Sequence, residues 1–528
     1  MSDEQGPRPR PPDVRRRYAP VAGLVAAAVG VGVGELIAAL VRPLASPVVA
    51  VGGAVVELVP TSVERWAISV FGTADKPVLV GGVLLVVGAA AVVAGVLATR
   101  RLAAGLAMVM AFGAAGAVAA LTRSGGGASD AGPAISGALA GGITLWLLVR
   151  AIPQAREADA GEPGGPRDQD TMETRRRFVL AALGGAGVAV LTAAVGRGLL
   201  GDRVDVSAAR SALRIPPPDD LIPGLRQGAQ LDVRGLGPFY TPNRTFYRID
   251  TALVVPQVDP KTWTLRVHGM VDREIRLTLG ELLRRSLLER DITLSCVSNE
   301  VGGDLVGTAR WVGVSLADLL REAGVHSGAD QLVSRSADGM TIGTPVDVVM
   351  DGRDALLAVQ MNGVPLPAEH GFPVRMLVPG LYGYVSATKW VVDLELTTFE
   401  AYDAYWVERG WAARAPVKTT SRIDVPGSFA RLKAGRVTVA GVTWAREPGI
   451  KFVQVRVDRG SWRRARVSTP MSRYAWRQWM YLWDAAPGEH TLQVRAVDRL
   501  ERIQTGQTAE PFPDGATGWH TISVTVEA

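Results

Sequence analysis

The stretch Thr293-Leu-Ser-Cys-Val-Ser-Asn-Glu-Val-Gly-Gly303 contains the only cysteine of the 528-residue chain, Cys296. A single cysteine forms no intrachain disulfide and no multi-cysteine zinc site. Taken alone, it is most simply a small buried hydrophobic residue. Here, however, an apolar run ends at the cysteine and a polar turn with two glycines follows. The sequence therefore predicts a thiolate at the end of a strand, where the backbone can approach a ligand.

The two parts of the chain differ in composition. Residues 1–200 are dominated by Ala, Val, Gly and Leu, whereas the remainder has ordinary charge density, most of the tryptophans and all five histidines. A bilayer is crossed by about 20 apolar residues, and five runs reach that length. These predicted spans are 19–41, 78–99, 102–121, 131–149 and 178–200. A sixth run, 48–59, is short and contains Glu57, which favours a re-entrant or interfacial segment.

Arginines indicate the orientation of the spans, because cytoplasmic loops retain positive charge. One group precedes the first span, one lies between the second and third, and one lies between the fourth and fifth. The members are Arg8, Arg10, Arg15, Arg16 and Arg17, then Arg100 and Arg101, then Arg150, Arg156, Arg175, Arg176 and Arg177. With five crossings, these groups share the cytoplasmic side. The sequence thus predicts a multi-pass cell-membrane protein whose residues after 200 are extracytoplasmic.

Thr174-Arg-Arg-Arg-Phe178, followed by an apolar run, resembles an internal twin-arginine export signal. The bias of arginine toward the cytoplasm explains the same residues equally well. No histidine precedes His268 and the chain has no Cys-x-x-Cys-His sequence, so we predict no haem in this chain. Any electrons must then be exchanged with a separate partner protein or carrier.

Residues 201–238 are rich in Asp, Arg, Pro and Gly and are predicted to be a linker that wraps the next domain. Residues 239–414 mix strands and helices irregularly, which is typical of an α+β domain. There we expect strands at 251–255 and 262–267, a helix at 277–288, a strand leading to Cys296, and a helix at 316–323 capped by Ser315.

Residues 415–528 change to an all-β pattern. Runs at 436–444, 451–458, 476–484, 491–498 and 520–526 alternate apolar and polar residues, and their spacing fits an immunoglobulin-like sandwich without a disulfide. Its tryptophans are predicted to form the core or an interface, and they are Trp444, Trp462, Trp476, Trp479 and Trp483.

A second dense segment begins with His370-Gly-Phe-Pro-Val-Arg375 and ends with Ser386-Ala-Thr-Lys-Trp390. Basic side chains between Gly and Pro turns can hold an anionic group against backbone amides, Arg as a fork and Lys as a point charge. A solvated basic loop is the alternative, but apolar residues such as Phe372 and Met376 are interleaved with the cations. We therefore predict an anion site.

Together these motifs resemble the sulfite oxidase family. Phe239 to Trp411 is similar to its molybdopterin domain, and Ser421 to Ala528 to its dimerisation domain. The resemblance is carried by Cys-Val-Ser-Asn-Glu-Val-Gly-Gly, His-Gly-Phe-Pro-Val-Arg and Ser-x-x-Lys-Trp. The chain also resembles bacterial membrane-attached members, in which the spans precede the catalytic domain.

The resemblance implies a mononuclear molybdenum enzyme whose Cys296 thiolate binds the metal, together with one pyranopterin (Moco). It implies that the catalytic groups are Cys296, Tyr247 and Arg244, and that the cofactor-binding residues are Asn243, Phe246, Tyr247, Ser298, Asn299, His370, Arg375, Ser386 and Lys389. Among these, His370, Arg375 and Lys389 match positions that hold the pterin and its terminal phosphate.

Two departures from the family concern the substrate. Sulfite-oxidising members carry an Arg just before the Asn of the pocket segment, where this chain has Pro242, and a Tyr five residues after a Trp, where Trp406 is followed by Trp411. The resemblance therefore implies that sulfite binds poorly. Oxygen-atom transfer on another small substrate, or on an oxidised side chain, is the expected reaction.

A metal-free binding or sensory module on the same fold is the alternative function, and a transporter is disfavoured because the spans carry few charged groups. The net charge of +6 does not indicate nucleic-acid binding, since much of the excess lies in the predicted cytoplasmic loops. The remaining expected partners are a small substrate, the membrane and a second copy of the chain.

Overall fold

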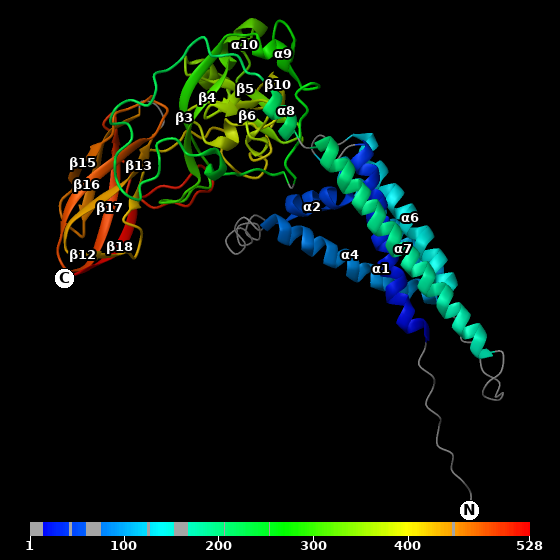
Figure 1. Ribbon diagram of the computed structural model, residues 1–528. Coiled ribbons are helices and arrows are strands. Elements are labelled where there is room, and N and C mark those ends of the chain that lie inside the picture. Colours follow the sequence, from blue (N-terminus) through cyan, green and yellow to red (C-terminus); the bar gives the residue numbers. More distant parts are fainter. Residues whose placement is uncertain are drawn as a thin grey trace, which may run out of the picture. The chain divides into compact units, whose positions relative to one another are not determined.

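The computed structural model describes residues 14–41, 45–59, 75–123, 127–152, 167–204, 206–252, 254–445 and 449–528 (Figure 1). The chain divides into two compact units, one of Met1–Asp205 with Ala252–Val254 and one of Val206–Thr251 with Val255–Ala528. Of the arginines used above to predict orientation, Arg8, Arg10 and Arg156 lie outside the described residues.

The first unit is helical. Its helices are α1 (Val14–Val41), α2 (Pro47–Leu58), α4 (Asp75–Arg100), α5 (Leu102–Thr122), α6 (Gly132–Ala151) and α7 (Arg167–Val204). Five stretches in the described residues are long and apolar enough to cross a membrane, namely Arg17–Val41, Val78–Arg100, Leu102–Thr122, Ala128–Ala151 and Arg175–Gly196. They coincide with the five predicted runs, and the 12-residue α2 coincides with the short sixth run.

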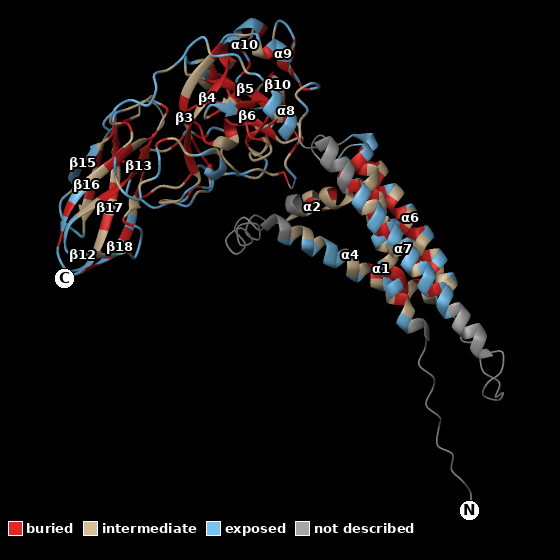
Figure 2. Cartoon of the chain, viewed as in Figure 1, coloured by how far each residue is buried: buried red, intermediate tan, exposed pale blue. Residues whose placement is uncertain are grey.

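Small residues let α1 and α6 approach closely. A Cβ added to Gly30 would lie 2.9 Å from the carbonyl oxygen of Gly137, and one added to Gly137 would lie 2.5 Å from that of Gly30. Many apolar side chains on the other faces stay exposed, as Figure 2 shows along α4 and α7.

The second unit begins with an α+β domain of two sheets. One has the order β2-β1-β10-β5-β6, and the other β3-β4-β7-β8 with β9 paired to β7. The strands are β1 (Thr264–Gly269), β2 (Ile275–Thr278), β3 (Leu287–Ser295), β4 (Val306–Ser315), β5 (Gln331–Ser336), β6 (Thr341–Pro345), β7 (Leu356–Met361), β8 (Val364–Pro365), β9 (Arg375–Leu377) and β10 (Val391–Thr397). The short helices are η4 (Asn243–Thr245), α9 (Leu279–Leu283), α10 (Leu316–Ala323), α11 (Val346–Met350), η5 (Ala368–His370) and η6 (Gly383–Val385).

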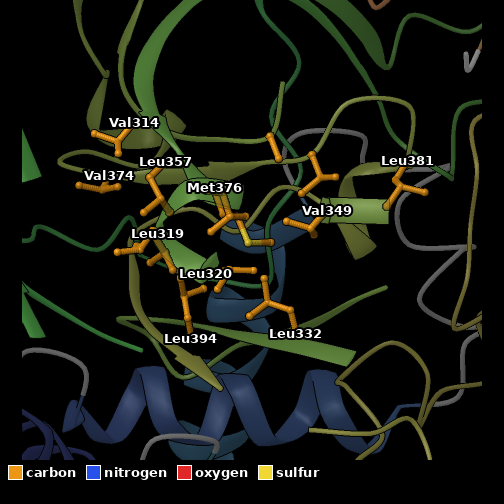
Figure 3. Packing of buried hydrophobic residues seen from close by; sticks show 14 of the residues in the cluster. Val314, Leu319, Leu320, Leu332, Val349, Leu357, Val374, Met376, Leu381 and Leu394 are labelled. Atoms are coloured by element: carbon orange, nitrogen blue, oxygen red, sulfur yellow. The ribbon is translucent and has the colours of Figure 1, made fainter. Parts of the chain in front are cut away.

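Helix α10 joins the two sheets through one core. The Ser315 hydroxyl accepts a hydrogen bond from the Asp318 amide and starts the helix where the sequence predicted. Leu319 and Leu320 then pack with Leu332 of β5 and Leu357 of β7, all fully buried (Figure 3). This core therefore holds in place the sheet that contains β3, the strand directly before Cys296.

Two predicted elements of this domain are wrong. The described residues of 251–255 form no strand, and Pro256, which follows them, lacks an amide donor for a strand ladder. The predicted helix at 277–288 is instead the end of β2, the one-turn helix α9 and the start of β3. Thr278 and Glu281 form a capping box that starts α9 at Leu279, while Leu287 and Leu288 pair with β4.

The C-terminal domain is a single eight-stranded curled sheet with the order β11-β13-β16-β15-β14-β17-β18-β12. Its strands are β11 (Thr420–Val425), β12 (Arg431–Lys433), β13 (Gly435–Trp444), β14 (Ile450–Val457), β15 (Arg463–Val467), β16 (Arg477–Ala485), β17 (Gly488–Asp498) and β18 (His520–Glu527). The five predicted runs are strands, and β11, β12 and β15 were missed. Because β15 pairs with both β14 and β16, one hydrogen-bonded path connects all strands, and the immunoglobulin-like sandwich stays a prediction.

The tryptophans of this sheet serve two cores. Trp479 and Trp483 are buried in the sheet's own core, whereas Trp444 and Trp476 belong to the core of the α+β domain. Trp462 is half-buried and packs edge to face against Trp519. Trp444 and Trp476 therefore form the interface between the two domains of this unit.

The predicted linker wraps this unit and contains one short helix, α8 (Ser207–Ala212). The amide of Asp219 donates to the Leu287 carbonyl at 2.9 Å. Farther along, the amide of Leu231 donates to Gln478 Oε1 at 2.7 Å. The segment thus contacts both the α+β domain and the C-terminal sheet.

We expect Trp476→Phe to lower the melting temperature of this unit by about 2–4 °C. The Trp476 indole donates to the Phe239 carbonyl at 2.9 Å, and losing that bond leaves a buried oxygen unpaired, which costs about 1–2 kcal/mol. Calorimetry of the detergent-solubilised chain measures the shift. Trp483→Phe is the control, since Trp483 lies in the other core; equal shifts in both variants would contradict the interface role.

Candidate functional site

Cys296 follows directly after β3 and is 9% exposed. Its amide donates to the Leu305 carbonyl at 2.9 Å, and the Asn299 amide donates to the Cys296 carbonyl at 3.2 Å. The Asn299 side-chain oxygen accepts from the Leu305 amide at 2.8 Å. We call residues 296–305 the cysteine turn. Two amides and one side chain thus hold the thiol at the strand end, as the sequence predicted.

The surroundings of the thiol act on its protonation in opposite directions. Burial is the largest effect and raises the pKa of Cys296 overall, whereas hydrogen bonds from the Ser298 amide and hydroxyl, the Val297 amide and the charge of Lys389 oppose it. These donors stabilise a thiolate, which is the form that binds a soft metal. Ser298 itself is exposed, and Asn299 is buried.

Arg375 lies on β9 and is only 6% exposed. Its Nε has no hydrogen-bond partner, and its Nη1 reaches the His370 carbonyl only at 3.4 Å. The guanidinium carbon lies 5.6 Å from the ring centroid of Trp311. Burial lowers the pKa of Arg375 to about 10. Within the described residues no carboxylate forms an ion pair with this buried cation.

Lys389 is the second buried cation. Its Nζ lies 2.9 Å from Asp250 Oδ2 and donates to the Glu369 carbonyl at 3.3 Å. Asp250 also pairs with Arg248 at 2.9 Å, so one carboxylate is shared by two cations. Burial lowers the pKa of Lys389 to about 8, and Asp250 opposes this shift. No motif in the sequence marks Asp250 as part of the site.

His370 is neutral and has a defined tautomer. Its Nε2 lies 2.9 Å from the Asn243 carbonyl, which can only accept, so Nε2 carries the proton and Nδ1 is left as an acceptor. Burial, followed by the charge of Arg375, lowers the pKa of His370 to about 4. Gly371 follows with φ +109°, and a Cβ there would lie 3.0 Å from Lys389 Cα and 3.2 Å from Arg375 Cβ. Glycine thus allows the backbone after His370 to pass close to both Lys389 and Arg375.

Four of the predicted site residues lie on η4 and directly after it. Asn243 donates to the Met361 carbonyl at 3.2 Å and accepts from Asn362 at 2.7 Å, which fixes this segment. Phe246 is buried and stacks on Tyr247 at a centroid distance of 5.3 Å. Arg244 is exposed at the rim. A cavity is lined by Asn243, Arg244, Phe246, Arg248, Val255, Gln257, Ala368, Glu369 and His370.

Two tyrosines lie near the thiol. Burial raises the pKa of Tyr247, and the neighbouring Cys296 charge raises it further. Burial raises the pKa of Tyr382 to about 12, with Asp514 and Cys296 adding to it. Both phenols are therefore protonated hydrogen-bond donors. Tyr382 was missed in the sequence although it lies inside the dense segment before Ser386.

The other predicted residues are placed differently. The Ser386 hydroxyl donates to the carbonyls of Tyr382 at 2.9 Å and Leu381 at 3.2 Å, so it braces its own loop. Trp411 packs against Tyr384 and Trp406, and against Phe512 of the C-terminal domain. Pro242 is exposed before η4.

These groups fit a cofactor that carries both a soft metal and an anion. The unpartnered Nε of Arg375 and the shared carboxylate of Lys389 leave the site short of negative charge. A phosphate would supply it through charge-assisted hydrogen bonds. The single thiol, turned toward donors at the strand end, is suited to bind the metal.

Comparison with known proteins also indicates a molybdenum cofactor. Residues 252–406 match the family described as the oxidoreductase molybdopterin binding domain. The chain thus carries a molybdopterin-binding oxidoreductase domain of the sulfite oxidase type. The cofactor of the domain is molybdopterin with molybdenum, in agreement with the site.

The relatives include mitochondrial sulfite oxidase of Homo sapiens, 29% identical over 342 residues that cover 54% of this chain and 62% of that protein. Mitochondrial sulfite oxidase of Drosophila melanogaster is 30% identical over 325 residues, which cover 50% of this chain and 55% of that protein. NADH nitrate reductase 1 of Oryza sativa subsp. japonica is 33% identical over 194 residues, which cover 32% of this chain and 21% of that protein. The chain thus spans less than two thirds of the length of these relatives.

Among solved structures, the sulfane dehydrogenase SoxCD from Paracoccus pantotrophus matches with a TM-score of 0.49 and 22% identity. The match covers 61% of this chain and 92% of that one.

We expect Arg375→Met to raise the stability of the cofactor-free chain by about 1–3 kcal/mol, because it removes a desolvated charge that has no counter-ion. The same variant should lose the cofactor, since an anion contact is gone. Calorimetry and molybdenum analysis measure the two effects. Arg353→Met is the control, because Arg353 is 2.6 Å from Asp351 and its loss should destabilise. Destabilisation by Arg375→Met, or retention of the cofactor, would contradict the anion site.

Anion binding by the cofactor-free chain should weaken as the pH rises through about 8, the pKa of Lys389. If only the ammonium form binds, the affinity for sulfate, whose charge is constant, falls about tenfold between pH 7 and 9. Between pH 8 and the usual lysine pKa, the unfolded chain holds a proton that the folded chain has lost, so stability rises with pH.

Isothermal titration calorimetry with sulfate tests this dependence. Lys389→Arg keeps its charge throughout this range, so its affinity should stay constant from pH 7 to 9. A wild-type affinity that is equally constant would show that Lys389 does not bind the anion.

Proposed function

We propose that this protein is a membrane-anchored mononuclear molybdenum oxidoreductase that transfers an oxygen atom to or from a small substrate or an oxidised side chain. The observation that carries the proposal is the buried Arg375, without a carboxylate partner among the described residues, in the same site as the only cysteine. When bound, the cofactor supplies the chemistry, an oxygen-atom transfer coupled to the exchange of two electrons.

The residues have separate roles in this proposal. The Cys296 thiolate binds the metal, and the hydrogen bonds of its turn hold the sulfur in place. Arg375 and Lys389 bind the terminal phosphate, and His370 accepts a hydrogen bond from the pterin at Nδ1. The remaining contacts line the cofactor pocket and come from Asn243, Phe246, Tyr247, Ser298, Asn299 and Ser386.

Tyr247 is proposed to donate a hydrogen bond to the oxygen of the bound substrate. Its raised pKa keeps the phenol protonated at neutral pH, and its position beside Cys296 suits that role. Arg244 is exposed at the rim of the cavity and would orient the substrate from outside.

Sulfite is disfavoured as the substrate. Pro242 offers no charge where sulfite-oxidising members carry an Arg, and Trp411 is packed among aromatic rings instead of offering a phenol hydroxyl. An uncharged substrate needs neither group. Screening the purified enzyme with sulfite, sulfoxides and N-oxides against an artificial dye separates these substrate classes.

Membrane anchoring is supported by the exposed apolar faces of the helical unit. Leu85 of α4 is 76% exposed and Val190 of α7 is 69% exposed, a state that lipid stabilises and water does not. We propose a multi-pass anchor with the catalytic domain on the extracytoplasmic side, exported with the help of the twin-arginine-like sequence before the last span. Electrons then pass to a separate partner, and the C-terminal domain is a candidate homodimer interface.

The alternative is a metal-free binding or sensory module. It is disfavoured because a site that had lost its cofactor would gain stability by replacing the buried cation Arg375. Under this alternative, protein matured in a cofactor-competent cell contains no molybdenum.

We expect the purified chain to contain close to one molybdenum and one pterin per protein. Cys296→Ser should lose at least about 10³-fold in activity, because the metal loses its only protein thiolate, and should keep its fold. Elemental analysis, pterin fluorescence and dye-linked assays measure these properties, with circular dichroism as the check on folding. A folded Cys296→Ser variant with full activity would remove the ligand role.

A further inference from the structure

We propose that Arg422 and His520 of the C-terminal sheet are positioning residues that hold the cysteine turn in place. The inference rests on the proposed role of Cys296 as the metal ligand. Arg422 lies on β11 and His520 begins β18, so both belong to a different domain from the turn.

His520 packs directly on the first glycine of the pair in the turn. Gly302 has φ +84°, and a Cβ there would lie 2.3 Å from both Cδ2 and Nε2 of the His520 ring. No larger residue fits at this contact without moving the ring. The imidazole therefore sets how far the turn can shift toward the sheet.

Arg422 binds the second glycine. Its Nη1 donates to the Gly303 carbonyl at 2.7 Å, and its Nε pairs with Asp424 at 2.5 Å. The side chain is largely buried, so the bond to the carbonyl is charge-assisted and shielded from water. Asp424 keeps the guanidinium aimed at the turn.

The protonation state of His520 fits this contact. The Ile423 amide donates to His520 Nδ1 at 2.9 Å, which places the proton of the neutral ring on Nε2. Burial, followed by the charge of Arg422, lowers the pKa of His520 to about 4. The ring therefore stays neutral beside the arginine at physiological pH.

The turn transmits this contact to the thiol. A Cβ added to Gly303 would lie 2.6 Å from Asn299 Oδ1, the atom that accepts the Leu305 amide. Leu305 in turn accepts the Cys296 amide at 2.9 Å. A shift of Gly302 and Gly303 thus displaces Asn299 and releases the backbone that fixes Cys296.

A role in domain packing alone is the alternative. It predicts that the variants lower stability without changing Cys296. The positioning role predicts a change at the thiol itself, and this is measurable because Cys296 is the only cysteine.

The test is the rate at which Ellman's reagent labels the cofactor-free, full-length chain in detergent. Arg422→Ala and His520→Ala should raise the rate about tenfold, because the turn opens locally more often. Arg422→Lys, which keeps a cationic donor, should restore part of the protection. His490→Ala and Arg431→Ala, in the same sheet but paired with Asp458 and Glu527, should label like the wild type.

A wild-type labelling rate in folded Arg422→Ala and His520→Ala would overturn the proposal, as would equal acceleration in the two controls. Arg422→Lys keeps the test decisive if the alanine variants do not fold: a rate between wild type and unfolded chain supports positioning, and the wild-type rate at lowered stability refutes it.

In the loaded protein, the variants should also shift the Mo(V) electron paramagnetic resonance signal, and an unchanged signal would count against the proposal. A chain without molybdenum would refute the proposed function while leaving the labelling result intact.

Discussion

The site depends on a buried positive charge that the described part of the chain does not neutralise. Arg375 is almost fully buried, and its Nε has no partner. Desolvating a cation without a counter-ion costs several kcal/mol, so the fold carries a cost that a bound anion would offset. Lys389 shares the Asp250 carboxylate with Arg248, and His370 stays neutral near the two cations. The neutral imidazole avoids a third like charge.

The thiol is held from two directions. The hydrogen bonds of β3 and β4 end at Cys296, while the C-terminal sheet contacts the glycines that follow. Trp476 adds a further link, because its amide donates to Thr293 Oγ1 at 2.7 Å, three residues before the cysteine. The C-terminal domain therefore belongs to the framework of the site, and its removal would free the segment that carries Cys296, the proposed metal ligand.

Local signals in the sequence predicted much of this arrangement. Ser315 placed the start of α10, alternation placed five strands of the C-terminal sheet, and the glycine turn placed Cys296 at a strand end. The prediction of one helix at 277–288 was wrong because the spacing of its leucines fits two structures equally well. One is a continuous helix, and the other is the observed strand end, single helical turn and strand start. Asp250, Tyr382 and Arg422 were missed because their contacts are made with residues far away in the sequence. The roles of the site residues stay predictions.

X-ray absorption spectroscopy at the molybdenum edge tests the central claim most directly, because it counts the sulfur atoms bound to the metal. With one pyranopterin supplying two sulfurs, the wild-type protein should show three, and the Cys296→Ser variant two. Two sulfurs in the wild type, or no change in the variant, would contradict the assignment of Cys296 as the metal ligand.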